Sequence, residues 1–503
     1  MSRSGGATRR QWAGLAVLSL PTMLVSMDLT VLYLAVPALS ADLSPSSTEL
    51  LWIVDIYGFL VAGLLITMGT LGDRIGRRRV LLGGAAAFGC ASLLAAFSTS
   101  AAMLIAARAV LGMAGATLMP STLSLIRNMF PIDSERSVAI GVWASSFSIG
   151  AVIGPLCGGL MLEHFWWGSV FLLNVPVMLL LLGLGPWLLP EFRDPRPGRF
   201  DLASVALSIV AMLSLIWGVK HLAKEGGSLS ALVALGLGVA LGLAFIRRQQ
   251  RLADPLIDLA LFRSPAFSVS AATNMLAVFV CLGVFLLIAQ YLQLVLGLSP
   301  LAAGLWTTPT ALANILGSMT APRLVRLVRP GQVVGAGLVL GAAGLLLLAR
   351  ADGLVVLVIA TAVMFLGVSA VMTICTDLIV ASAPPERAGV ASAISETGGE
   401  LGGALGIALL GSVALLVYRL ALAGHLPTEW HGMSFAETLA MADTLPGSQG
   451  IELRDAARAA FVLSMRFTAA TGAGLALCAA LAVPILLRRL PRQALAPAAA
   501  ADG

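Results

Sequence analysis

The chain has 503 residues, of which 58% are hydrophobic and only 11% are charged. Soluble globular proteins contain roughly 45–50% apolar and about 25% charged residues, so this composition excludes an ordinary soluble protein. The formal net charge is +6. Taken alone, that excess of basic residues could indicate a nucleic-acid partner, and its placement along the chain decides the question.

Apolar runs of about 20 residues recur along the chain, and each is long enough to cross about 30 Å of hydrocarbon. A helix satisfies its own backbone hydrogen bonds within one such segment. The sequence therefore predicts an all-α polytopic membrane protein. The runs predict fourteen spans, at residues 12–37, 50–70, 80–98, 102–126, 138–162, 169–189, 201–220, 229–246, 266–290, 301–321, 332–350, 354–376, 390–418 and 459–487.

The order of the spans predicts two six-helix halves with an extra helix pair between them, a plan typical of transporters built from repeats. The predicted parts are the tail 1–11, the N-terminal half 12–190, the extra pair 201–246, the C-terminal half 266–487 with an outside loop at 419–458, and the tail 488–503. Residues 317–323 of the second half echo residues 69–74 of the first.

Most of the 31 lysines and arginines fall in the loops on the N-terminal side of the predicted spans. Basic loops remain in the cytoplasm, and an even number of spans puts both ends on one side. Both termini are therefore expected to be cytoplasmic, in the inner membrane of a bacterium. The basic charge reflects membrane orientation, so the expected partner is the lipid bilayer and no nucleic acid.

The cysteines all fall inside predicted spans, where lone thiols pack as small apolar groups, so neither disulfides nor a metal site are expected. The only lysines, Lys220 and Lys224, are not preceded by glycine, so the chain lacks the phosphate loop of an ATP-driven pump. It also lacks the H-E-x-x-H metal-binding motif. An enzyme is therefore disfavoured, and no cofactor is expected.

The loop between the second and third spans reads Gly69-Thr70-Leu71-Gly72-Asp73-Arg74-Ile75-Gly76-Arg77-Arg78-Arg79. It resembles the signature G-x-L-A-D-R-x-G-R-[RK]-R of the major facilitator superfamily, with Gly72 where alanine is usual. Glycines permit a tight turn, and the aspartate can face a helix N-terminus and nearby cations. The resemblance implies a releasable latch made by Gly69, Asp73, Arg74, Gly76 and Arg77; the alternative is a merely basic inner loop.

The fifth span contains a glycine-rich segment that resembles the superfamily's antiporter signature, G-x-x-x-G-P-x-x-G-G. The matching residues are Gly150, Gly154, Pro155, Gly158 and Gly159. Glycines four residues apart form a groove for a neighbouring helix, and proline permits a bend. Ordinary helix packing would produce part of this pattern as well.

Residues 27–37 of the first span resemble the pattern D-x-T-[IV]-V-N-V-A-L-P of the fourteen-helix drug:proton antiporter subfamily, with Tyr33 in place of the usual asparagine. Asp28 falls near mid-membrane, where an unpaired carboxylate would take up a proton or bind a cation. A proton and a cationic cargo would therefore compete for one negative charge. Residues 50–57 and 162–176 resemble the quaternary-ammonium and methyl-viologen resistance pumps of that subfamily.

Further charged and aromatic residues are candidates for the same site. Asp55 and Tyr57 lie in the second span, and an aromatic face attracts an organic cation. Arg108 and Gly112 fit the R-x-x-x-G pattern that the superfamily associates with proton transfer, whereas a structural ion pair is the alternative. Such a charge at mid-membrane costs roughly 2.5–3.5 kcal/mol, so it must face protein or water.

Glu396 and Glu400 of the thirteenth span are four residues apart, so both carboxylates lie on one helix face. The resemblance implies a role in substrate recognition, and two negative charges would suit a dicationic cargo. The alternative is a helix end at the cytoplasmic interface.

Together, these patterns predict a monomeric, proton-driven secondary transporter that exports lipophilic organic cations such as quaternary ammonium compounds, dyes, viologens and biguanides. The alternative on the same scaffold is export of an endogenous metabolite or a self-made antibiotic.

Overall fold

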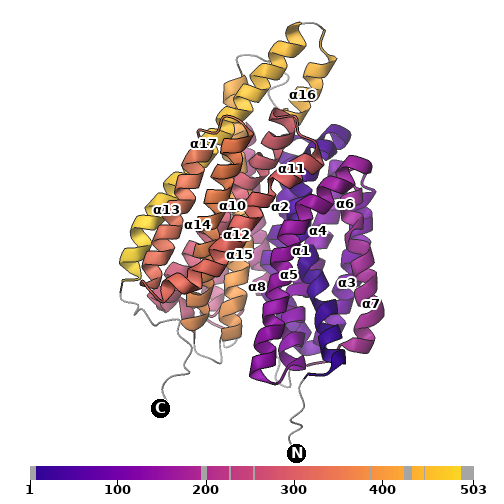
Figure 1. Ribbon diagram of the computed structural model, residues 1–503, viewed down its shortest axis with the longest axis vertical. Helices are drawn as coiled ribbons and strands as arrows, with labels where there is room; N and C mark the ends of the chain where they lie inside the picture. The colour runs from indigo at the N-terminus through magenta and orange to yellow at the C-terminus, as the bar shows by residue number, and fades with distance from the viewer. Residues whose placement is uncertain are drawn as a thin grey trace, which may run out of the picture. The chain divides into compact units, whose positions relative to one another are not determined.

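A computed structural model describes residues 7–193, 201–225, 228–252, 255–383, 388–423, 433–446 and 448–488. These residues form helices joined by short connections, and no strand occurs among them (Figure 1). The predicted all-α class is therefore confirmed. The tail 489–503 and parts of the predicted outside loop lie outside the described residues.

The chain divides into two compact units, residues Met1–Met212 with Gly297–Leu305, and residues Leu213–Leu296 with Trp306–Gly503. Unit 1 holds α1 (Arg9–Leu43), α2 (Ser47–Ile75), α3 (Arg77–Ala96), α4 (Ala101–Met129), α5 (Asp133–His164), α6 (Ser169–Leu172), α7 (Asn174–Leu188) and most of α11 (Pro300–Trp306). The helix α8 (Leu202–Glu225) is divided between the units at Met212.

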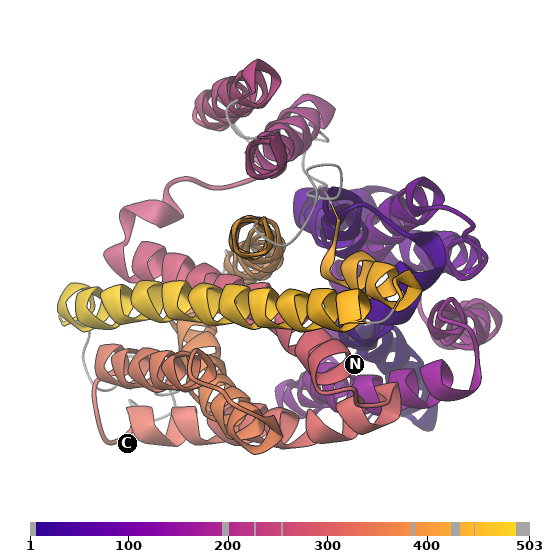
Figure 2. The same cartoon turned by 90° about the horizontal axis from the view of Figure 1, so that it is seen from above.

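Unit 2 holds the later helices. They are α9 (Leu229–Gln249), η1 (Leu261–Arg263), α10 (Pro265–Gln290), η2 (Tyr291–Val295), α12 (Thr308–Val325), α13 (Pro330–Leu348), α14 (Leu354–Ala381), α15 (Ala388–Leu422), α16 (Phe435–Thr444) and α17 (Ser448–Leu486). Figure 2 shows the long α17 (yellow) beside α13, and α13 in turn packs against α14.

The two units repeat one arrangement of six helices. In unit 1, α1 packs against α5, α2 against α4, and α3 against both α4 and α7. In unit 2, α10 packs against α15, α12 against α14, and α13 against both α14 and α17. Each unit therefore has the internal plan expected of one half of a repeat-built transporter. The exact bounds predicted for the halves remain predictions.

Twelve of the described helices are long and apolar enough to cross a membrane. Helix α1 bends by 43° between its segments Arg9–Asp28 and Thr30–Leu43. If these two segments together count as one span, the number of spans is thirteen. The remaining predicted span, 301–321, is divided at Thr307 between α11 and α12. Pro309 in the first turn of α12 explains this break, because proline lacks the N–H donor that would continue α11.

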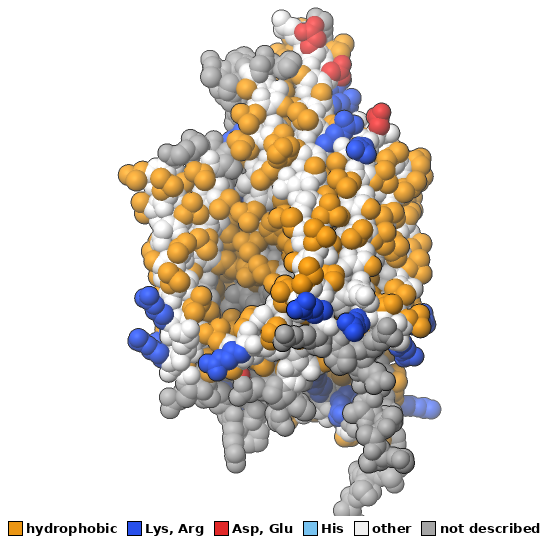
Figure 3. Space-filling model, turned by 90° about the vertical axis from the view of Figure 1, so that its left-hand side faces the viewer, with side chains coloured by type: hydrophobic (Ala, Val, Ile, Leu, Met, Phe, Trp, Pro, Cys, Tyr) orange, Lys and Arg blue, Asp and Glu red, His pale blue; other side chains and the backbone are white. Residues whose placement is uncertain are grey.

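The surface of the helices agrees with a lipid environment. On the face drawn in Figure 3, hydrophobic side chains cover the middle of the helices, and Lys and Arg side chains lie toward their ends. Apolar side chains on α9 are largely exposed, including Leu229 at 78% and Val233 at 61%. A helix with this much exposed apolar surface is unfavourable in water and is stabilised in hydrocarbon.

Candidate functional site

Unit 1 contains a buried ion pair between α1 and α4. Nη1 of Arg108 donates a hydrogen bond to Oδ2 of Asp28. The side chain of Arg108 has no exposed surface, and that of Asp28 is 3% exposed. Asp28 is also the last residue before the bend in α1. Sequence reasoning left the partner of Arg108 open, and the structure identifies it as Asp28.

Arg108 is held from a third helix as well. Its Nε donates to the carbonyl oxygen of Ile53 at 3.2 Å and its Nη2 to that of Val54 at 3.5 Å, both on α2. Its guanidinium carbon lies 4.8 Å from the centroid of the Tyr57 ring. A buried charge is tolerated only when it is paired and its donors are bonded, and these contacts meet that requirement.

The glycines that follow Arg108 allow α2 to approach α4. A Cβ atom added at Gly112 would lie 2.7 Å from the backbone oxygen of Tyr57, and one at Gly115 would lie 2.9 Å from its hydroxyl oxygen. Both distances are shorter than real Cβ atoms accept. The R-x-x-x-G spacing therefore has a packing cause, because glycine makes room for the tyrosine under the guanidinium. Asp55, on the same helix, is 1% exposed.

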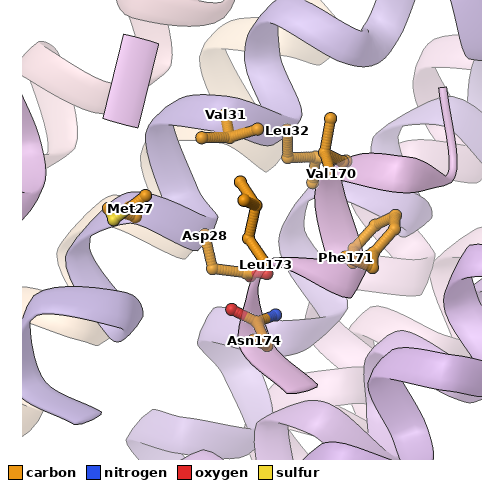
Figure 4. Close-up of a pocket in the computed structure, with 8 residues that line it drawn as sticks. All are labelled: Met27, Asp28, Val31, Leu32, Val170, Phe171, Leu173 and Asn174. Atoms are coloured by element: carbon orange, nitrogen blue, oxygen red, sulfur yellow. The ribbon is translucent and has the colours of Figure 1, made fainter. Parts of the chain in front are cut away.

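A small pocket opens beside Asp28 (Figure 4). Its lining comes from α1, α6 and the start of α7, and consists of Met27, Asp28, Val31, Leu32, Val170, Phe171, Leu173 and Asn174. Nδ2 of Asn174 donates a hydrogen bond of 3.2 Å to Oγ of Ser92 on α3. Sequence reasoning matched Asn174 only as part of a longer resemblance. The sequence signal that could have identified Asn174 is a polar amide side chain near the start of a predicted apolar span.

The glycines of the antiporter motif lie against the part of α1 that carries Asp28. A Cβ atom at Gly158 would lie 2.6 Å from Cγ1 of Val31, and one at Gly154 would lie 3.2 Å from Cα of Met27. Gly150 faces the backbone of Met23 in the same way. The glycines of α5 therefore let it pack closely against α1, both before and after the position of Asp28.

Two residues of that motif, Pro155 and Gly159, contact α11 within unit 1. A Cβ atom at Gly159 would lie 2.7 Å from Cα of Leu301. The backbone of Pro155 lies against Gly304. The motif therefore serves two helix contacts, one with α1 and one with α11.

In the loop motif, Asp73 at the end of α2 and Arg77 at the start of α3 form an ion pair across the turn between the two helices. The distances from Oδ1 of Asp73 are 2.8 Å to Nε and 2.6 Å to Nη2 of Arg77. Nη1 of Arg77 also reaches the carbonyl oxygen of Pro120 on α4, at 3.4 Å. Gly69 faces Pro120 at ordinary contact distance, and the side chain of Arg74 is exposed.

An acidic residue that sequence reasoning missed completes this loop. Oε1 of Glu191, just after α7, accepts the backbone N–H of Arg78 at 3.1 Å, and Oε2 lies 3.7 Å from Nε of both Arg78 and Arg79. Gly76 has a φ of +117°, which a side chain rarely adopts. A carboxylate at a helix N-terminus is stabilised by the unpaired N–H groups there, so Glu191 caps α3.

The second pair of candidate carboxylates lies in unit 2. Glu396 and Glu400 are half-buried and stand one turn apart on α15. Further along this helix, glycines face α10 much as the α5 glycines face α1. A Cβ atom at Gly403 would lie 2.5 Å from Cδ1 of Leu282, and Gly406 faces the backbone of Phe279.

A family model for the Major Facilitator Superfamily matches residues 18–407. The chain belongs to the major facilitator superfamily. It is 46% identical over 488 residues to the multidrug efflux pump LfrA of Mycolicibacterium smegmatis, with 95% of this chain and 97% of LfrA covered. It is 39% identical over 475 residues to the methyl viologen resistance protein SmvA of Salmonella typhimurium, with 90% and 94% covered.

A third relative is the tetracenomycin C resistance and export protein of Streptomyces glaucescens, which is 32% identical over 515 residues and covers 98% of this chain and 95% of its own. Among solved structures, a bacterial homologue of the human lysosomal transporter Spinster matches with a TM-score of 0.66 and 16% identity, covering 96% of this chain and 99% of that one. At this identity, the likeness concerns the fold. The chain is therefore a multi-pass membrane transporter of this superfamily.

Proposed function

We propose that this protein is a proton-coupled antiporter that exports lipophilic organic cations from the bacterial cytosol. The observation that carries the proposal is the buried carboxylate of Asp28, which is paired with Arg108 and lines a pocket at the bend of α1. The names of the relatives LfrA and SmvA support drug efflux as the activity.

The proposed coupling depends on competition for one negative charge. When Asp28 is ionised, it can be neutralised by Arg108 or by a cationic cargo; when it takes up a proton, its attraction for both is lost. Arg108 keeps its hydrogen bonds to Ile53 and Val54 in either state, because the acceptors are backbone carbonyl oxygens, which do not titrate. Binding of a proton therefore releases the cargo and loosens α1 from α4 at its bend.

The remaining candidate residues take supporting roles in this proposal. Tyr57 was expected to offer its ring to the cargo, but Arg108 covers that ring face, so we assign Tyr57 to positioning Arg108. Glu396 and Glu400 attract the cargo, and two carboxylates favour a dication. Asp55 is buried on α2, the helix that carries Tyr57, and its carboxylate adds negative charge there.

The energy source in this proposal is the proton gradient across the bacterial cytoplasmic membrane, without a cofactor. Alternation between states open to the two sides is the established plan for repeat-built transporters. The Asp73–Arg77 pair at the loop motif then acts as a latch between these states. Both termini are cytoplasmic and the unit of transport is one chain.

A second cargo class has specific support. The matched relatives include Streptomyces proteins named for tetracenomycin C export, puromycin resistance and, provisionally, actinorhodin transport. These names favour export of a natural product as the alternative cargo. Growth of a deletion strain on dyes, biguanides and natural products distinguishes the two cargo classes, because only compounds that the protein exports become more toxic to that strain.

The proposal is tested by ethidium transport in everted membrane vesicles energised with a proton gradient. We expect Asp28→Asn to abolish gradient-driven transport, because the amide cannot exchange a proton for a cation. Asp352→Asn is the matched control, since Asp352 is exposed just before α14 and lies outside the site. Transport by Asp28→Asn at the wild-type rate would refute the coupling role of Asp28.

A further inference from the structure

The pocket beside Asp28 lies between α1 and the α6–α7 segment (Figure 4). Six of its eight lining residues are apolar, and the two polar ones are Asp28 and Asn174. Asp28 also pairs with Arg108 from α4, which is not one of the lining residues. Asp28 therefore has both an ion-pair partner and a neighbouring pocket.

Asn174 is fixed in place by its neighbours. It is 3% exposed, and its amide N–H bonds to Oγ of Ser92, which is fully buried on α3. An asparagine amide has two N–H donors and an oxygen with two acceptor lone pairs, so the bond to Ser92 uses one of its four possible hydrogen bonds. A buried amide held in this way presents its remaining polar atoms at a defined position in the pocket.

We propose that this pocket holds the water that carries protons between the outside and Asp28, and that Asn174 is its positioning residue. A buried water molecule needs two to four polar partners. The carboxylate of Asp28 and the amide of Asn174 supply them, and the apolar remainder of the lining offers nothing to a larger polar ligand. A hydronium ion gives its proton to the carboxylate and leaves as water. The inference rests on the proposed function, since it specifies the proton path of that exchange.

The pocket lies close to one end of unit 1. α6 begins at Ser169, just after Trp166 and Trp167, whose indole N–H groups bond to the oxygen of Ala96 at 3.1 Å and to Asp42 at 2.6 Å. Ala96 is the last residue of α3, so this end is opposite the basic loop motif and, by the positive-inside rule, faces outward. Asn174 is five positions after Ser169 in the sequence, which corresponds to about 8 Å along a helix.

Asn174 is the polar residue beside Asp28 that can be substituted without changing the charge around the carboxylate. Arg108 faces the carboxylate from α4, and Tyr57 of α2 lies beyond Arg108. The lining residues from α6 and α7 carry no titratable group. A change at Asn174 therefore alters water binding without altering the charge beside Asp28.

The test compares two modes of ethidium transport by the full-length protein in liposomes. Exchange of labelled for unlabelled ethidium at equal pH needs no net proton movement. Transport of ethidium against its concentration gradient needs protons to flow in the opposite direction. We expect Asn174→Leu, of similar size, to slow gradient-driven transport roughly tenfold, as the loss of one hydrogen bond predicts. Exchange should stay near the wild-type rate. Asn174→Ser, which leaves room for water and a polar partner, should restore most of the driven transport.

Two outcomes would overturn the inference. Driven transport by Asn174→Leu at the wild-type rate would remove Asn174 from the proton path. An equal loss of exchange and driven transport would make it a structural residue only. Asn128→Leu on the exposed surface of α4 is the control for the substitution itself. If the wild-type protein showed exchange but no response to a proton gradient, the proposed function would fail instead.

Discussion

Asp28 on α1 and Arg108 on α4 form an ion pair in which the arginine side chain has no exposed surface and the aspartate side chain is only 3% exposed. They are 80 residues apart in the chain. A buried pair of this kind contributes little net stability, because desolvation offsets the attraction, but removing one partner leaves an uncompensated charge. The pair is therefore better suited to a conformational switch than to stabilising the fold.

Removal of the arginine charge should destabilise the protein more than removal of both charges. Arg108→Gln leaves Asp28 unpaired, with an expected loss of about 3–5 kcal/mol. The double variant Arg108→Gln with Asp28→Asn should recover most of that loss yet remain inactive in transport. Thermal unfolding of the purified proteins measures the first effect and ethidium efflux the second. Equal unfolding temperatures for the single and double variants would contradict the pairing.

Arginine itself should be required in the pair. Arg108→Lys keeps the charge, but a single ammonium group cannot reach Asp28 and both carbonyl oxygens of Ile53 and Val54 at once. We expect folding to survive and the maximal transport rate to fall roughly tenfold, since one or two hydrogen bonds are lost. Wild-type rates in Arg108→Lys would show that the carbonyl contacts are incidental.

Side chains introduced on the α1 side of α5 should separate these helices. Gly154→Val would force atoms into Thr30 and Met27, and overpacking of this kind costs about 1–3 kcal/mol. Gly141→Val on the same helix is the matched control, because nothing lies within 4 Å of a Cβ atom there. Folded yield and melting temperature should fall for Gly154→Val alone. Similar behaviour of both variants would argue against the α1–α5 contact.

Loss of the Glu191 charge should weaken the start of α3. Glu191→Gln retains an acceptor for the N–H of Arg78 but loses its attraction to Arg78, Arg79 and the helix N-terminus, an effect of about 1 kcal/mol. We expect a lower melting temperature that high salt masks, because salt screens the same charges in the wild type. Glu163→Gln, exposed at the end of α5, serves as the comparison. A shift independent of salt would exclude the electrostatic cause.

The carboxylates of α15 should select the charge of the cargo. In Glu396→Gln and Glu400→Gln, we expect the KM for methyl viologen, a dication, to rise roughly tenfold, and that for ethidium, a monocation, to rise less. The ratio of the two KM values in liposomes is the measurement. An unchanged ratio would mean that neither carboxylate distinguishes the cargoes.

Much of the fold could be predicted from the sequence because lipid imposes a simple rule. A helix that crosses hydrocarbon must be apolar and about 20 residues long, so the length of the apolar runs predicted the all-α class. The break at Thr307 was missed because hydropathy averages over the segment, although Pro309 carried the signal.

The candidate site was less predictable, since its contacts join distant residues. Motif spacing identified Asp28, Arg108 and the α5 glycines, but no local pattern specifies that Arg108 also bonds to the backbone of α2. For the same reason, Glu191 was missed and Asn174 was matched only as part of a longer resemblance. Each acts through a partner on another helix, Arg78 and Ser92 respectively.

The most direct test of the account is the pH dependence of ethidium binding by the purified wild-type protein, with proton release followed in a weakly buffered solution. If protons and cations compete for Asp28, affinity must fall as the pH is lowered, and binding must release protons, since the two effects are thermodynamically linked. Loss of both effects in Asp28→Asn would locate the competition at that residue. Ethidium binding that is indifferent to pH and releases no protons from the wild-type protein would contradict the account.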